Sequence, residues 1–377
     1  IVTFSDQTRS TILSATHVAN TDVDAQGNVK VSIVTKYSTA VISDDPTWVG
    51  GMDGSVIFSE SDAIDKQTIT TTAFDTRGNA LDQAIIKDSY VDGAWQFTEA
   101  MKIETDSIDL HDRALHSVIK NYSDAGMGDP SFTTMQDINY ERYDRFGNVE
   151  EQTIDTYDSQ TVIPTNLVNH QKIVNDYNLA GGVDNPVARA RGNARLSTVT
   201  RWNALNEATI NLIDMTVTET LQFDTRGNAV EQESVTSVYS GVALVESSKR
   251  HIYNENIDNR GDAGTQRVTS YLIDGGIDTL VSYQVFTNRK FVDHNCVNQL
   301  VIRYDREDAG KVVLDAQEIR ASAFYSSGVA IAQDIVTFSD QTRSTILSAT
   351  HVENNVVDAQ GNVRESVVTK YSTATIS

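Results

Sequence analysis

The chain has 377 residues, 39% of them hydrophobic, and a net charge of −22 from 52 acidic and 30 basic side chains. The acidic excess argues against nucleic acid or an anionic membrane as a partner, because both would repel the chain. The single cysteine, Cys296, excludes an intrachain disulfide framework and a cysteine-built zinc site. No apolar run approaches the roughly 18 residues of a spanning helix, so no membrane insertion is expected. The chain opens with IVTFSDQTRS, without an initiator Met or a signal-peptide pattern, which favours a processed chain or part of a longer one.

The first 43 residues recur almost unchanged at the other end of the sequence. Residues 335–377 repeat residues 1–43, and seven positions differ between the two copies (19, 21, 22, 30, 31, 33 and 41 of the first). A tandem array uses such repetition, because each unit meets its neighbour across the same interface. We therefore predict one long repeat over 1–334, built of about seven β-hairpin modules, and the start of a near-identical repeat over 335–377. A closed ring such as a propeller with overlapping ends is the alternative.

Hairpin turns follow one another along the chain. The pattern aromatic or apolar–Asp–x–x–Gly–Asn occurs at 23–28, 74–79, 143–148, 223–228 and 357–362, with degenerate copies at 188–193 and 257–262 and another candidate at 304–310. Aspartate can accept a hydrogen bond from the backbone two residues on, and glycine takes the left-handed conformation that starts the next strand. The predicted turn residues are Asp24, Gly27, Asn28, Asp75, Gly78, Asn79, Asp144, Gly147, Asn148, Asp224, Gly227, Asn228, Asp358, Gly361 and Asn362.

The strand after each turn also repeats. Five residues beyond the glycine lies Gln83, Gln152, Gln232 or Gln266, and an aromatic residue stands at or near the tenth position. The aromatic positions include Tyr37, Tyr157, Trp202, Tyr271 and Tyr371. The apolar positions two and seven residues past the glycine fall on opposite faces of a regular strand. Either a bulge brings them to the same face, or both faces of the strand are partly covered. We favour covering of both faces by neighbouring hairpins.

Other segments predict further hairpins and surface loops. Turn signals lie in 90–97, 238–244, 272–280 and 324–332, and residues 203–215 fit either a helical turn or a strand. Gly- and Asp-rich insertions at 43–55, 123–131 and 179–186 are expected on the surface. The predicted fold class is all-β: an elongated tandem array of β-hairpins, solenoid- or fibre-like, with few or no helices.

The aromatic–Asp–x–x–Gly–Asn turn followed by a strand ending in Tyr resembles the YD-repeat of very large bacterial secreted and surface proteins. Runs such as INYERYDRFGNVEEQTIDTY are similar to the hairpin repeats of giant extracellular bacterial proteins. The resemblance implies an elongated β-structure at the cell surface, in appendages or envelopes. The uneven unit spacing departs from the roughly twenty-residue YD-repeat, so the large cocoon of toxin-associated members is not expected.

Candidate chemistry is sparse. Asp22, Asp24 and Gly27 imitate the opening of a calcium loop, but Asp22 becomes Val356 in the second copy, which favours a structural turn. His111 and His116 do not have metal-ligand spacing. No cofactor is therefore expected, with calcium between repeats as the alternative. Trp48, Trp95 and Trp202 would bind glycan if exposed, and pack within hairpins otherwise.

The leading hypothesis is a non-catalytic structural repeat of an extracellular fibre or cell-surface appendage, which associates with other copies of the same repeat along its axis. Dense negative charge would keep exposed strand edges apart. The first alternative is a glycan- or cell-binding adhesin with calcium-stabilised repeats. The second is a carbohydrate-active enzyme on a β-propeller or β-helix.

Overall fold

The computed structural model describes residues 1–4, 12–44, 54–91, 93–177, 185–357 and 361–374. Its strands are the segments rich in Val, Ile, Thr and Tyr, side chains that fit a pleated, half-buried surface. The first strands are β1 (Val2–Phe4), β2 (Ile12–Val23), β3 (Val29–Tyr37), β4 (Val41–Asp44), β5 (Gly54–Ile57), β6 (Ala63–Phe74), β7 (Ala80–Val91), β8 (Ala94–Ile108), β9 (Ala114–Tyr122), β10 (Phe132–Tyr143) and β11 (Val149–Tyr157). The others are β12 (Leu167–Asp176), β13 (Leu196–Trp202), β14 (Leu212–Phe223), β15 (Ala229–Tyr239), β16 (Leu244–Ile257), β17 (Ala263–Asp274), β18 (Ile277–Val292), β19 (Asn295–Tyr304), β20 (Val313–Phe324), β21 (Ala330–Phe338), β22 (Ile346–Val357) and β23 (Val363–Tyr371).

Helical structure in the described residues is limited to short turns. The α-helix α1 covers Pro186–Ala190, and single 3₁₀ turns are η1 (Glu60–Asp62), η2 (Asp129–Ser131), η3 (Pro164–Asn166) and η4 (Thr209–Asn211). The segment 203–215, for which helix and strand were both open, contains η4 and then the beginning of β14. No helix among the described residues has the length and apolar character needed to cross a bilayer.

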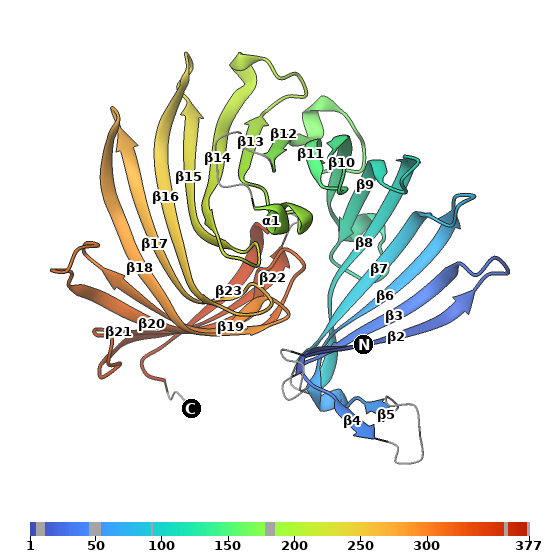
Figure 1. Ribbon diagram of the computed structural model, residues 1–377, viewed down its shortest axis with the longest axis horizontal. Coiled ribbons are helices and arrows are strands. Elements are labelled where there is room, and N and C mark those ends of the chain that lie inside the picture. The colour runs from blue at the N-terminus through green and yellow to red at the C-terminus, as the bar shows by residue number, and fades with distance from the viewer. Residues whose placement is uncertain (5–11, 45–53, 92, 178–184, 358–360, 375–377) are drawn as a thin grey trace.

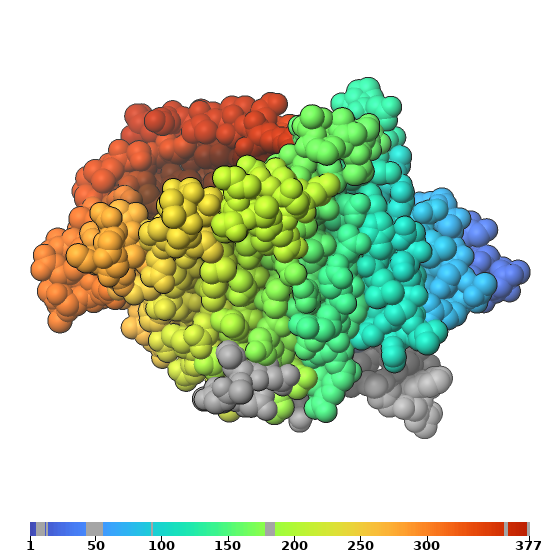
Figure 2. All heavy atoms as spheres, turned by 90° about the horizontal axis from the view of Figure 1, so that it is seen from above, coloured from blue at the N-terminus to red at the C-terminus, as the bar shows by residue number. Residues whose placement is uncertain are grey.

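The described residues form one 21-stranded antiparallel sheet in which each strand pairs with the next strand of the sheet along the chain, and β4 and β5, which lie between β3 and β6 in the sequence, form a separate hairpin. The predicted elongated all-β array of hairpins is therefore confirmed. A propeller and a β-helix are wrong frameworks for the described strands, because a propeller divides its strands into blades and a β-helix pairs them in parallel. In Figure 2 the chain colours follow one another across the surface, from orange through yellow and green to blue.

The sheet curls instead of extending flat, so that late hairpins meet early strands (Figure 1). Lys36 in β3 forms an ion pair with Asp293, which lies in the turn between β18 and β19. Lys87 Nζ in β7 donates a hydrogen bond to the Phe324 carbonyl, 3.0 Å away at the end of β20. The sequence predicted the hairpins but not this curvature.

Bulges lie consistently in the strand before a turn. The register shifts at Asn20/Asp22, Thr71/Ala73, Tyr140/Arg142, Thr220/Gln222 and Asn354/Val356. The strands after the turns are half-buried on both faces, as in β11 and β15. The strand that follows the turn is therefore partly covered on both faces, as its apolar pattern indicated. The bulge lies in the strand that precedes the turn.

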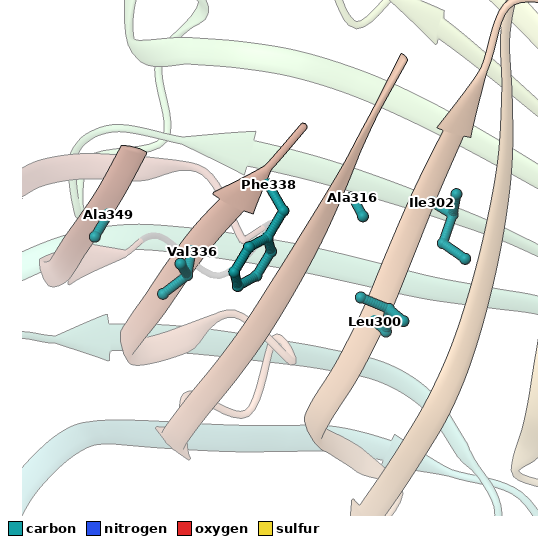
Figure 3. Packing of buried hydrophobic residues seen from close by; sticks show 6 residues of the cluster. All are labelled: Leu300, Ile302, Ala316, Val336, Phe338 and Ala349. Atoms are coloured by element: carbon teal, nitrogen blue, oxygen red, sulfur yellow. The ribbon is translucent and has the colours of Figure 1, made fainter. Parts of the chain in front are cut away.

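The core is thin and distributed along the sheet. One cluster of buried side chains spans β19 to β22 and consists of Leu300, Ile302, Ala316, Val336, Phe338 and Ala349 (Figure 3). A smaller cluster on β8, β9 and the loop after it contains Ala100, Tyr122 and Met127. Each cluster joins only neighbouring strands, as expected for a repeat protein in which each unit contacts the next.

Candidate functional site

Alternate connections of the sheet place the recurring turns along one rim, because successive turns of an antiparallel meander lie at opposite ends of the strands. The turn at Asp24–Asn28 shows the common geometry. Asp24 Oδ1 accepts hydrogen bonds from the backbone N–H groups of Gln26 and Asn28, both at 2.9 Å, and Oδ2 accepts one from the Asn28 side chain. Gly27 has a positive φ of 93°. The recurring motif therefore closes a turn in which the carboxylate uses both oxygens.

The same contacts occur in the turns of Asp75, Asp144 and Asp224. The matching glycines Gly78, Gly147, Gly227 and Gly361 also have positive φ. Asp358 lies outside the described residues, and Asn362 follows Gly361 immediately before β23. Asp258 and Gly261 form the degenerate turn, in which Asp262 takes the place of asparagine.

Hydrogen bonds join successive turns from residue 75 onward, and we call this row the turn ladder (turns 75–79, 109–113, 144–148, 189–193, 224–228 and 258–262, ending at 293–294). Arg77 Nη1 donates to the Asp109 carbonyl at 2.8 Å, and the Asn79 side chain donates to Asp112 Oδ1 at 2.9 Å. Further along, the Asn148 side chain donates to the Arg189 carbonyl at 2.8 Å.

The ladder continues through arginine side chains. Arg191 Nη1 donates to Asn228 Oδ1 at 2.9 Å, and Arg226 Nη1 donates to the Asp258 carbonyl at 2.8 Å. His294 Nδ1 lies 2.9 Å from Asp262 Oδ1 at the far end. An arginine within the motif thus lies between its own aspartate and the next turn, which explains why Arg recurs there as well as Asp, Gly and Asn.

Two members of the ladder were missed in the sequence. Asp109–Arg113 forms the same turn, with Asp112 at a φ of 62° in place of glycine and Arg113 Nε donating to Asp109 Oδ2 at 2.7 Å. The turn between β18 and β19 uses Asp293 and His294, both with positive φ. The pattern Asp–x–x–Asp could have predicted the turn at Asp109–Arg113, because aspartate tolerates the left-handed backbone conformation.

One candidate turn was misplaced. Residues 304–310 lie in the connection between β19 and β20, at the rim opposite the turn ladder, and Gly310 lacks a positive φ. The hairpins predicted at 238–244, 272–280 and 324–332 are present as β15–β16, β17–β18 and β20–β21. The hairpin at 90–97 joins β7 and β8, with residue 92 outside the described part.

The recurring glutamines have a structural explanation. Gln83 Nε2 donates to Thr71 Oγ1 and Gln232 Nε2 to Thr220 Oγ1, both at 3.2 Å across the hairpin. Gln266 Nε2 makes the same kind of contact with Asn254 Oδ1 at 2.8 Å. Each pair joins the two strands of a hairpin, and the pairs of Gln83 and Gln232 lie beside a bulge.

A repeated asparagine was not noticed in the sequence. The side chains of Asn175, Asn254 and Asn354 each reach back to the first residue of an earlier strand and donate to its carbonyl. For Asn354, which is 6% exposed, the acceptor is Ala330 at 2.8 Å. A buried donor of this kind specifies strand register, because a slip would leave it unpaired.

The repeat aromatics differ in how deeply they are buried along the sheet. Tyr157 and Trp202 are buried, at 1% and 7% exposed, in the middle of the sheet. Tyr37 contacts Phe58 with 4.6 Å between ring centroids and a 32° angle between the ring planes, whereas Tyr371, its counterpart in the second copy, is 54% exposed.

Burial and the nearby Glu307 carboxylate raise the pKa of Tyr271, the remaining repeat aromatic, to about 12. Among the tryptophans, Trp95 donates to Glu60 Oε1 at 2.9 Å and lies under Lys66, and Trp48 lies outside the described residues. Trp202 and Trp95 are thus engaged in packing within the structure.

No group of three or more His, Cys, Asp or Glu residues that could hold a metal ion occurs in the described part of the chain. His116 lies between the carboxylates of Asp106 and Asp137, at 2.7 and 2.8 Å, and His111 is on the neighbouring turn. Cys296 is half-buried in β19.

The turn ladder predicts a loss of stability in acid. The hydrogen bond from the Asn79 side chain lowers the pKa of Asp75 to about 2, and that from Arg113 lowers the pKa of Asp109 to about 2. Both values lie below the roughly 3.9 of an unfolded aspartate. The stabilisation is therefore fully present above about pH 4 and is lost as the pH falls toward 2.

Thermal unfolding followed by circular dichroism between pH 6 and pH 2 measures this effect. We expect the midpoint to fall most steeply between pH 4 and pH 2. The double variant Asp75→Asn and Asp109→Asn should be less stable than the parent at pH 6 and depend less on pH. A midpoint that stays constant from pH 4 to pH 2 would contradict the prediction.

The comparisons with known proteins give a coarse result. No family model matches the chain, and no curated protein matches it. The crystal structure of TcdB2–TccC3 is similar at 13% identity and a TM-score of 0.22, over 92% of this chain and 20% of that chain. The Photorhabdus luminescens Tc holotoxin pore is similar at 12% identity and a TM-score of 0.21, over 93% and 19%. The chain thus spans only a small part of the proteins to which it is similar.

The fold defines the class of protein. One meandering antiparallel sheet, in which turn contacts recur from hairpin to hairpin, makes the chain a tandem β-strand repeat protein.

Proposed function

We propose that this chain is a structural repeat of an extracellular fibre or cell-surface appendage, similar in kind to the YD-repeat, with a non-catalytic role. The observation that carries the proposal is the unbroken sheet in which strand order equals chain order. Each hairpin adds ladder hydrogen bonds and turn contacts to the one before it, so such a structure extends by repetition without a new core.

The charge distribution supports the same function. A sheet with open ends presents unpaired backbone groups that invite uncontrolled association. With a net charge of −22, chains repel one another over most of their surface, so that only matched ends come together. The proposed partners are further copies of the same repeat.

Electron microscopy of chains with increasing numbers of repeats tests this function. The 377-residue chain is compared with a chain in which residues 1–334 occur twice before 335–377. We expect the particle to lengthen along one axis by a constant increment per added repeat, while its width stays the same. Small-angle scattering provides the control measurement. A compact particle that grows equally in all directions would overturn the proposal.

A further inference from the structure

The two copies of the terminal repeat allow an internal comparison of the same sequence in two surroundings. Strands β2 and β3 pair with Ala15 opposite Tyr37, and β22 and β23 pair with Ala349 opposite Tyr371, with a bulge at the same place in both. β3 also pairs with β6 on its other edge, whereas β23 pairs with β22 alone in the described part of the chain. All nine residues of β23 are exposed, while most of β3 is half-buried.

In the first copy, the side chain of Phe58 covers the position next to β3. The centroid of the Phe58 ring lies 4.6 Å from the centroid of the Tyr37 ring and 5.4 Å from that of the His17 ring. In the second copy, His351 and Tyr371 hold these two places and line a cavity of about 610 Å³. The cavity thus lies where the first copy seats the segment that leads into β6.

The edge of β23 also matches β6 in charge and apolar character. Lys36 lies opposite Asp65 across β3 and β6, and Asp65 is only 7% exposed. Lys370 stands in the place of Lys36. Val34 in β3 faces Gln67 in β6, and its counterpart in the second copy, Val368, is 52% exposed. A strand with the sequence of β6 would therefore bring a carboxylate to Lys370 and cover Val368.

We propose that the free edge of β23 and the adjoining cavity bind a segment with the sequence of residues 56–74, supplied by a further copy of the repeat, in the register in which β6 pairs with β3. The inference rests on the proposed function and adds the strand, the register and the aromatic anchor. Phe58 fills the cavity and residues 63–74 add a strand by backbone pairing.

A labelled peptide tests binding directly. The peptide VIFSESDAIDKQTITTTAF, residues 56–74, is titrated with the 377-residue chain in a fluorescence anisotropy experiment. We expect saturable binding that a scrambled peptide does not show. Phe58→Ala in the peptide should weaken binding at least about tenfold, because a buried phenyl ring is lost. Thr68→Pro together with Ile69→Pro should abolish it, since one of the two ladder donors faces β23.

Disulfide trapping tests the register. In a Cys296→Ser chain, Val368→Cys is combined with a peptide that carries Gln67→Cys, the residue that faces the equivalent valine in β3. Residues opposite each other in an antiparallel pair are about 4.5–5.5 Å apart at Cα, within reach of a disulfide. The matched control is a peptide with Thr70→Cys, three residues out of register, which should crosslink far more slowly.

Three results would overturn the inference: no saturable binding, equal binding of the scrambled peptide, or equal crosslinking at both peptide positions. Dimers of the chain that the peptide does not displace, measured by analytical ultracentrifugation, would also overturn it, because another surface would then cover β23. If repeats lengthen particles in electron microscopy but the peptide fails, this inference alone falls. If the peptide binds in register but particles do not lengthen, the proposed function falls.

Discussion

Gly227→Ala is expected to lower the free energy of unfolding by about 4 kcal/mol. Gly227 has a φ of 80°, and a side chain in that conformation costs about 1–2 kcal/mol. A Cβ here would also lie 2.5 Å from the backbone nitrogen of Ala188 in α1. Because that neighbour is backbone and cannot rotate away, α1 must move off the turn.

The displaced helix would lose specific hydrogen bonds. The Asn185 side chain donates to the Asp224 carbonyl at 2.9 Å, and the Asn193 side chain donates to the Gly227 carbonyl at 2.8 Å. Each contributes about 1 kcal/mol, which accounts for the remainder of the expected loss.

Gly147→Ala is the matched control. Gly147 occupies the same motif position with a φ of 88°, but an added Cβ would meet no atom within 4 Å. It should therefore lose only the conformational cost of about 1–2 kcal/mol. Hydrogen exchange measured by mass spectrometry should speed up across α1, β14 and β15 in the Gly227 variant and remain near the parent rate there in the control. Equal destabilisation by the two substitutions would show that the contact with α1 is unimportant.

Phe338→Ala should lower stability by about 3–5 kcal/mol, the usual cost of deleting a buried phenyl ring. Phe338 is 2% exposed and belongs to one buried cluster with Leu300 and Ile302 on β19, Ala316 on β20 and Val336 on its own strand, β21 (Figure 3). Since the sheet has only a thin core, few other side chains can move in to fill the cavity.

The repeat supplies a control with the same local sequence. Phe4 ends the first IVTF segment as Phe338 ends the second, but Phe4 is only half-buried. Phe4→Ala should cost less than about half as much, because less apolar surface is removed from water. Denaturant unfolding followed by tryptophan fluorescence measures both variants. Equal losses would mean that local sequence, and not the packing around β19 to β22, determines the contribution.

The local structure could be predicted because turn chemistry is short-range. Asp24, Gly27 and Asn28 form a complete hydrogen-bonded unit within five residues, so the sequence motif contains everything that the turn needs. The turn at Asp109 was missed because Asp112 replaces the glycine that marks the others. The connection at 304–310 was misassigned because Asp305 bonds to Val312, seven residues on, and closes a longer loop.

The curvature of the sheet and the contacts between turns could not be predicted in this way. The hydrogen bond from Lys87 to the Phe324 carbonyl joins residues 237 positions apart, and nothing in either segment marks the other as its partner. The curl is the sum of small twists between many strand pairs, which a sequence pattern does not record. The bonds of Arg77 and Arg226 to the next turn depend on that same geometry.

The pairing of each strand with its immediate successor also determines how this chain can fold. Apart from the few contacts between early and late strands, every partner of a strand becomes available as soon as the next strand of the sheet has been made, and such low contact order favours rapid folding. The growing sheet provides a template on which each new hairpin is completed in order. A chain that emerges end first from a ribosome or a narrow export channel can therefore fold behind its leading end, without waiting for its last residue.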